Sequence, residues 1–151
     1  MLFTGHAELT VDAKGRLAIP AKYRNAWEAE RDGSSWISIP WPTGIIRLYT
    51  ERAFEALASQ GEQSLTPDPD EAELEAQLFG LAEPLNLDSA GRVLLPKTHL
   101  RLTGISGEVV VVGARNRLEV RERAAWMQEE ERRFQSLPAL VARIEARKRR
   151  E

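Results

Sequence analysis

Apolar residues alternate with polar or small ones in two short stretches near the start of the chain. Leu9 and Val11 form the first stretch, and Leu17 and Ile19 form the second. A period of two residues is typical of half-buried β-strands. Pro20, which cannot donate a backbone hydrogen bond, fits the first turn of a helix. The pattern therefore predicts strand, tight turn, strand and then a short helix.

The same pattern recurs 76 residues further along the chain. Residues 9–20 read LTVDAKGRLAIP, and residues 85–96 read LNLDSAGRVLLP. The identical pairs are Leu9/Leu85, Asp12/Asp88, Gly15/Gly91, Arg16/Arg92 and Pro20/Pro96. A single Asp-x-x-x-Arg motif arises easily by chance, but two copies with matched glycine, proline and apolar positions indicate an internal duplication.

The residues after each copy also correspond. Strand-like WISIPW and GIIRLYT follow the first copy, and strand-like EVVVVGA and RLEVRERAAWM follow the second. Each half therefore reads as strand, turn, strand, short helix, strand, strand, helix. We expect a first repeat over residues 1–65 and a second over residues 85–136.

Two further segments lie outside the repeats. Residues 66–84 predict a linking helix, in which Asp70 is expected to be the N-cap with Glu73 three residues later, as in a capping box. The final helix of the second repeat is expected to be interrupted at Pro138. Residues 137–151 then form a basic C-terminal tail that ends in ARKRRE.

One repeat has too few apolar side chains to bury the faces of its own hairpin, whereas two repeats that pair through their hairpins can share a core. We therefore predict an α+β protein. Its centre is a pseudo-two-fold swapped-hairpin β-barrel, built from the two internal repeats and flanked by short helices. The repeats together form one compact domain.

The turn within each repeat has a clear physical basis. The carboxylates of Asp12 and Asp88 can accept hydrogen bonds from backbone N–H groups a few residues on, which fixes the turn. Gly15 and Gly91 stand where a tight connection requires a positive φ. These four residues are the predicted turn-fixing motif.

Composition limits the possible chemistry. The chain has 151 residues, no cysteine and two histidines, which leaves little for a metal centre, and no cofactor or metal is expected. No apolar run is long enough to cross a membrane and no signal pattern begins the chain, so a cytoplasmic location is expected. An enzyme is also unfavoured, because each candidate aspartate has an arginine at hand to keep it ionised and no nucleophile–base pair accompanies it.

Charge is unevenly distributed, although the net charge is only −2. Residues 1–27 hold four Lys or Arg against two carboxylates, and residues 85–105 hold three against one. Residues 51–83 hold nine carboxylates against one arginine. Since binding depends on the local field, this pattern matters more than the sum.

The segments LFTGHAELTVDAKGRLAIPAKYR and LFGLAEPLNLDSAGRVLLPKTHLR resemble the MraZ family, over essentially all of residues 1–130. The resemblance implies a transcriptional regulator of the division and cell-wall gene cluster, of the AbrB-like swapped-hairpin class. It further implies a ring-like homo-oligomer, associated with the nucleoid, that binds short direct repeats in double-stranded DNA upstream of its own operon. The sequence departs from relatives at Thr4 and at the acidic stretch EAELEAQ, where arginines often stand.

The resemblance places the DNA contacts at the Asp-x-x-x-Arg turns, which map to Lys14, Arg16 and Arg92. Arginine can bind guanine through two hydrogen bonds, and both Lys and Arg neutralise phosphates. We expect Arg16 to read a base edge, with Lys14 and Arg92 contacting phosphates. Ala90 replaces the lysine in the second turn, so the two turns are not equivalent cationic surfaces.

Two alternatives remain open at this point. Arg16 and Arg92 could be purely structural partners of the two aspartates. The chain could also be an antitoxin-like interaction module of the same fold, although such proteins usually carry one repeat per chain.

Overall fold

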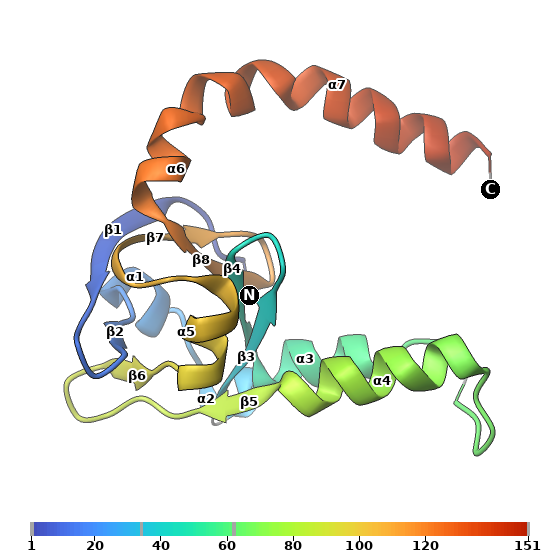
Figure 1. Ribbon diagram of the computed structural model, residues 1–151, viewed down its shortest axis with the longest axis horizontal. Helices are drawn as coiled ribbons and strands as arrows, with labels where there is room; N and C mark the ends of the chain where they lie inside the picture. The colour runs from blue at the N-terminus through green and yellow to red at the C-terminus, as the bar shows by residue number, and fades with distance from the viewer. Residues whose placement is uncertain (1, 34, 62, 151) are drawn as a thin grey trace.

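Two successive copies of the same series of elements make up the chain in the computed structural model, which describes residues 2–33, 35–61 and 63–150 (Figure 1). The first copy contains β1 (His6–Val11), β2 (Arg16–Ala18), α1 (Ala21–Arg24), α2 (Ala29–Asp32), β3 (Trp36–Trp41), β4 (Ile45–Thr50) and α3 (Glu51–Ala58). The second contains β5 (Glu83–Leu85), β6 (Arg92–Leu94), α5 (Lys97–Thr103), β7 (Gly107–Gly113), β8 (Arg117–Glu122) and α6 (Arg123–Gln128). Helix α4 (Pro69–Leu81) joins the copies, and α7 (Glu130–Arg149) follows them.

The two copies exchange their first strands. The order of the six-stranded antiparallel sheet is β1-β7-β8-β4-β3-β5, so β1 pairs with the second copy and β5 with the first. Strands β4 and β8 pair at the centre of the sheet. Outward from this pair, equivalent strands follow in the same order on both sides: β7 and then β1 beside β8, and β3 and then β5 beside β4. The prediction of an α+β protein is therefore confirmed.

The strand pairing does not describe a closed barrel. Among the residues that the structure describes, β2 and β6 form a separate two-stranded ribbon, and β1 and β5 are the edges of the larger sheet. The ribbon connects to the sheet by packing: Leu17 and Val93 are fully buried in the same core as Ile46 and Leu118. The ribbon is thus fixed over the sheet without continuing its hydrogen-bond ladder.

Aromatic residues close the core at one end. The ring of Trp36 lies 5.5 Å from that of Phe3 and 4.9 Å from that of Trp27. Phe3 is held there by a backbone bridge to Arg115, with N···O distances of 2.8 and 3.0 Å. The N-terminal segment therefore belongs to the core.

The start of α4 differs from the prediction. Asp68, and not Asp70, is the N-cap, since its Oδ1 accepts hydrogen bonds from the backbone N–H groups of Asp70 (2.9 Å) and Glu71 (3.2 Å). Pro69 then occupies the first helical turn, where its missing N–H costs nothing. The spacing of a capping box favoured the wrong aspartate.

The predicted interruption at Pro138 is also wrong. Helix α7 continues through Pro138 to Arg149, and the chain changes direction earlier, between α6 and α7 at Glu129. A proline removes one helical hydrogen bond, but the exposed surface of α7 lets water reach the unpaired carbonyl group, and the surrounding Ala, Leu, Arg and Glu favour helix. The basic tail is consequently the last part of a long helix.

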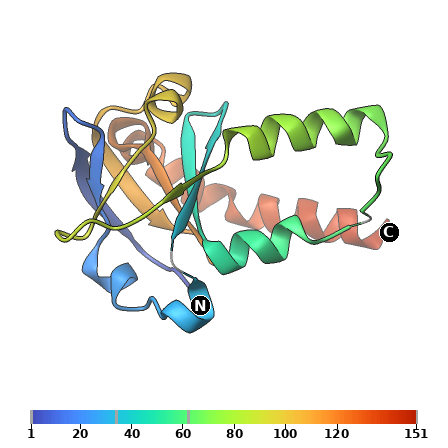
Figure 2. The same ribbon diagram turned by 90° about the horizontal axis from the view of Figure 1, so that it is seen from below.

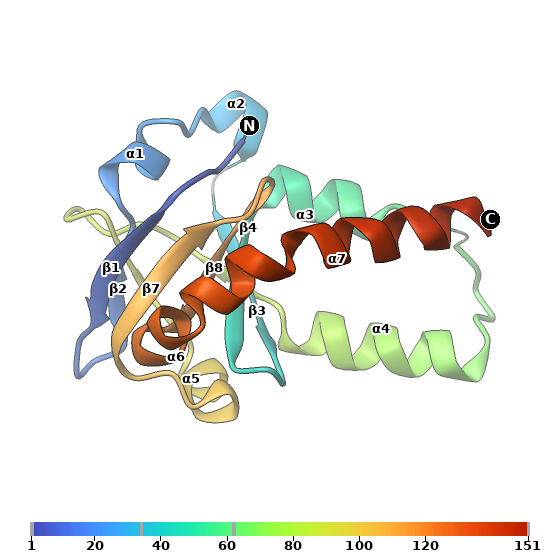
Figure 3. The same ribbon diagram turned by 90° about the horizontal axis from the view of Figure 1, so that it is seen from above.

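Helices α3 and α4 project away from the β2–β6 ribbon. Figure 2 shows α3 and α4 extending from one end of the sheet, whereas the turns before β2 and β6 lie at the other end. Figure 3 shows α7 leaving the body through α6. No helix in the described part of the chain is long and apolar enough to cross a membrane.

Candidate nucleic-acid interface

The β2–β6 ribbon places both predicted arginines on one face. In the antiparallel register Arg16 is opposite Leu94, Leu17 is opposite Val93, and Ala18 is opposite Arg92. Directly opposed residues share a face, and neighbours along a strand alternate. Since Leu17 and Val93 are buried in the core, Arg16 and Arg92 both project outward. They are diagonal neighbours, about 7–8 Å apart at the backbone.

Asp12 organises the first turn. Its Oδ1 accepts hydrogen bonds from the backbone N–H groups of Lys14 (3.0 Å) and Arg16 (2.9 Å). Its Oδ2 accepts one from Nε of Arg16 at 2.6 Å. The backbone closes the same turn, since Gly15 N donates to Asp12 O at 2.9 Å. One carboxylate thus fixes both the loop and the direction of the arginine.

Asp88 repeats this geometry in the second turn. Its Oδ1 accepts from the N–H groups of Ala90 and Arg92, both at 2.9 Å, and its Oδ2 lies 3.0 Å from Arg92 Nε. Gly91 N donates to Asp88 O at 3.0 Å. The two motifs that the sequence predicts therefore have the same structure.

Each turn is also held by the other repeat. Ile19 N donates to Gly91 O at 3.0 Å, and Leu95 N donates to Gly15 O at 2.9 Å. Both glycines have positive φ, 88° at Gly15 and 76° at Gly91, as the tight turns require. The two turns consequently form one unit.

Hydrogen bonding keeps both aspartates ionised. The backbone N–H of Arg16 is the largest cause and lowers the pKa of Asp12. Desolvation comes second and opposes it, but the side chain of Arg16 and the N–H of Lys14 lower the pKa further, so the net shift is downward. The N–H of Arg92 likewise lowers the pKa of Asp88. Both ion pairs are therefore present at neutral pH.

The arginines keep donors for a ligand. Each pairs with its aspartate through Nε, and within the described residues neither has a hydrogen-bond partner on its terminal amino groups. About a third of each arginine side chain is exposed, 34% for Arg16 and 36% for Arg92. Lys14 is exposed beside Arg16, whereas Ala90 leaves the second turn without this charge.

Two nearby cations prove to have structural partners. Lys22 Nζ donates to His6 O at 3.2 Å, and Arg24 Nε donates to Ile19 O at 2.8 Å. Lys97 and Arg101 are exposed on α5. No pattern in the sequence separates the two cations that have partners from the two that are exposed.

A buried ion cluster on β8 was missed by the sequence reasoning. Glu119 is 3% exposed and lies within 4 Å of three arginines, Arg47 (3.6 Å), Arg117 (2.9 Å) and Arg121 (2.5 Å). Burial raises the pKa of Glu119, but the hydrogen bonds and charges of Arg121 and Arg117 outweigh it and lower the pKa. The alternation in RLEVRE was the available signal, because it places Arg117, Glu119 and Arg121 on one face of the strand, opposite Leu118 and Val120.

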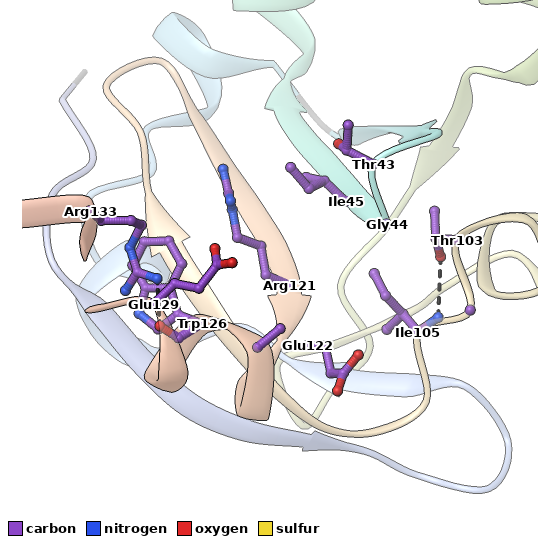
Figure 4. Close-up of a pocket in the computed structure, with 12 residues that line it drawn as sticks. Thr43, Gly44, Ile45, Thr103, Ile105, Arg121, Glu122, Trp126, Glu129 and Arg133 are labelled. Atoms are coloured by element: carbon purple, nitrogen blue, oxygen red, sulfur yellow. Dashed lines mark hydrogen bonds between the residues drawn. The ribbon is translucent and has the colours of Figure 1, made fainter. Parts of the chain in front are cut away.

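The pocket in Figure 4 lies at the root of α6 and is separate from the turns. Arg133 stacks on the ring of Trp126 at 3.4 Å, and Arg121 lies 5.2 Å from the same ring. These contacts fix the start of α7 against the sheet.

The described residues contain no group of His, Asp or Glu suited to hold a metal ion.

The duplicated strand order and the paired Asp–Arg turns define a protein of the swapped-hairpin type, with both turns on one exposed ribbon. The MraZ family model, described as "MraZ protein, putative antitoxin-like", matches residues 2–75 and again residues 78–147. The chain belongs to the MraZ family, which confirms the resemblance and the duplication.

Curated relatives carry the name transcriptional regulator MraZ. The protein of Shewanella frigidimarina is 30% identical over 128 residues, 85% of this chain and 84% of its own length. That of Photorhabdus laumondii is 31% identical over 128 residues, with the same coverage of both chains. That of Coxiella burnetii is 31% identical over 125 residues, 83% of this chain and 82% of its own.

Proposed function

We propose that this protein is a DNA-binding transcriptional regulator, with the β2–β6 ribbon as its DNA-binding surface. The observation that carries the proposal is the common outward face of Arg16 and Arg92, each held by its own aspartate. Preorganised arginines with free terminal amino groups fit the paired acceptors of guanine or of a phosphate. The names of the relatives support the same function.

The cations of the two turns have different roles in DNA binding. Arg16 reads a base edge in the major groove, which a two-stranded ribbon is narrow enough to enter. Lys14 and Arg92 neutralise phosphates. The diagonal spacing of the arginines, about 7–8 Å, corresponds to about two base-pair steps of 3.4 Å.

Charge separation explains how an acidic protein binds DNA in this proposal. The acidic helix α4 lies at the opposite end of the sheet from the turns, so it faces away from a duplex on the ribbon (Figure 2).

One ribbon offers only three cations and binds weakly. A ring-like homo-oligomer on successive direct repeats gains by effective concentration, by about 10²-fold or more. The proposed operator lies upstream of the protein's own gene in the division and cell-wall cluster, which places the protein at the nucleoid.

A fluorescence anisotropy titration tests this function with the full chain. The probes are a duplex from upstream of its own gene and a scrambled duplex of equal length. R16A is expected to weaken binding to the first duplex by about 1–3 kcal/mol and to reduce the preference over the second. R52A is the matched control, since Arg52 is an exposed cation on α3, far from the ribbon.

Equal binding by wild type and R16A would contradict the assignment of Arg16. Loss of binding in R52A of the same size would show that only total charge matters. If the protein instead copurified with a stoichiometric partner protein and bound neither duplex, the antitoxin-like alternative would replace the regulator.

A further inference from the structure

Helix α7 carries an apolar surface that no other described part of the chain covers. Phe134, Leu137, Val141 and Ile144 are spaced three, four and three residues apart and are 65%, 55%, 57% and 43% exposed. This spacing places them on one side of the helix, as in the seam of a coiled coil. We call these four residues the α7 stripe. It is about 15 Å long at 1.5 Å per residue.

A second apolar surface lies between α3, α4 and the outer face of β3 and β4. This α3–α4 groove has a volume of about 320 Å³ and is lined mainly by Trp41, Tyr49, Phe54, Leu57, Leu74 and Phe79. Phe54 and Phe79, which both line it, meet edge to face at 5.8 Å. Leu74 is 56% exposed and Leu57 40% exposed, so the walls are open.

The groove and the stripe belong to separate parts of one molecule. No residue of α7 lines the groove. Figure 1 shows α7 standing apart from α3 and α4, and the stacking of Arg133 on Trp126 fixes its root in that position. The stripe therefore does not fill the groove of its own chain.

Charge on the two helices is complementary. Glu71, Glu75 and Phe79 follow one another at intervals of four residues, so they lie on the same side of α4. Phe79 lines the groove, which places the two glutamates beside it. Arg147 and Lys148 follow Ile144 by three and four residues, so they continue the stripe at the C-terminal end of α7. Within the described part of the chain, none of these four charged residues forms an ion pair. The side chain and charge of Asp68, and then the charge of Glu75, raise the pKa of Glu71, as expected for acids without a nearby cation.

We propose that the α3–α4 groove of one copy of this chain receives the α7 stripe of a second copy. The 13 residues of α4 span about 20 Å, enough for the whole stripe. The apolar residues meet in the groove, and Arg147 and Lys148 face Glu71 and Glu75. Since groove and stripe are different surfaces, the contact is heterologous and closes into a ring when the rotation between copies permits. This inference rests on the homo-oligomer of the proposed function and identifies its interface.

Size-exclusion chromatography with light scattering tests the contact across a range of protein concentrations. The groove variant E71R/E75R and the helix variant R147E/K148E are each expected to raise the concentration of half-assembly by about tenfold or more. Their equimolar mixture is expected to assemble again, because the basic groove of one now meets the acidic helix of the other. L74E and V141E each place a carboxylate in the apolar part of the contact and are expected to weaken assembly. A142E, on the other side of α7, is the control and is expected to leave assembly unchanged.

The remaining outcomes overturn the inference. If only the helix variants weaken assembly, α7 pairs with α7 and not with the groove. A mixture that does not assemble better than its components also contradicts the contact, as does a wild-type protein that is monomeric throughout. Circular dichroism and the R16A-sensitive binding of DNA are measured on the same samples. A monomer that still binds DNA through Arg16 refutes this interface and leaves the proposed function standing.

Discussion

The guanidinium group of Arg24 lies directly over Gly91, where a Cβ atom would stand 3.0 Å from Arg24 Cζ. Arg24 belongs to the first repeat and Gly91 to the turn of the second. At the equivalent place in the other half, Leu100 lies over Gly15, with its Cδ1 3.2 Å from the position of a Cβ. Each turn is therefore packed under a side chain of the other repeat, so the two turns respond together to a change in either.

Substitution G91A is expected to destabilise the protein by about 1–2 kcal/mol, the cost of a left-handed conformation for an L residue. Alanine must keep the positive φ and must also push the guanidinium group of Arg24 aside by a few tenths of an ångström. Urea denaturation at fixed protein concentration measures the change. G61A is the matched control, because Gly61 also has a positive φ but meets no atom within 4 Å. G91A should therefore cost more than G61A, and equal costs would show that Arg24 adds nothing.

The ion pairs of the turns predict a specific dependence on acid. The pKa of Asp12 and that of Asp88 are lowered in the folded protein, so their contribution to stability is complete above the ordinary carboxyl pKa. It is lost as the pH falls through the lower, folded pKa. The stability advantage of wild type over D12N/D88N should therefore shrink in that acidic window. Urea denaturation at a series of pH values measures it, and an advantage that stays constant through the window would refute the assignment.

Substitution A90K is expected to strengthen DNA binding, because it gives the second turn the lysine that the first turn already has. One additional phosphate contact steepens the dependence of log K on log salt by about 0.9. K14A should make the slope shallower by the same amount. Anisotropy titrations at several salt concentrations give the slopes, and an unchanged slope in both variants would mean that neither position faces phosphate.

Substitution E119Q is expected to cost about 3 kcal/mol, because it leaves three arginines around a buried neutral group. E108Q is the matched control, since Glu108 is 76% exposed and 3.6 Å from Arg123. Such an exposed pair contributes less than about 1 kcal/mol. Denaturant titrations of both variants measure the difference, and similar costs would contradict a structural role for the cluster.

The sequence predicted the duplication and both turns well because these features are local. Asp12, Gly15 and Arg16 act within five residues, and the same spacing recurs at Asp88. The exchange of strands was predicted from the inability of one repeat to cover its own hairpin. The register that brings Arg16 and Arg92 to one face depends on the pairing of β2 with β6, which only the structure provides.

The features that sequence reasoning missed depend on distant contacts or on competition between local rules. Arg47 and Glu119 are far apart along the chain, and their meeting follows from the pairing of β4 with β8. At Pro138 a local rule predicted a break, but the loss of one hydrogen bond was outweighed by strong helix formers on both sides. At the start of α4 the spacing of a capping box pointed to Asp70, but Asp68 accepts the hydrogen bonds of the first turn and Pro69 follows it inside the helix.

The exchange of first strands has a consequence for protein synthesis. His6 is translated early, but its partner Val112 is translated roughly 5–20 s later at ordinary rates of elongation. During that interval the first repeat emerges from the ribosome without the neighbours of β1 and β4, so their unpaired backbone groups are exposed to other nascent chains. Chaperone binding to the half-made chain is expected to end when the second repeat supplies β7 and β8.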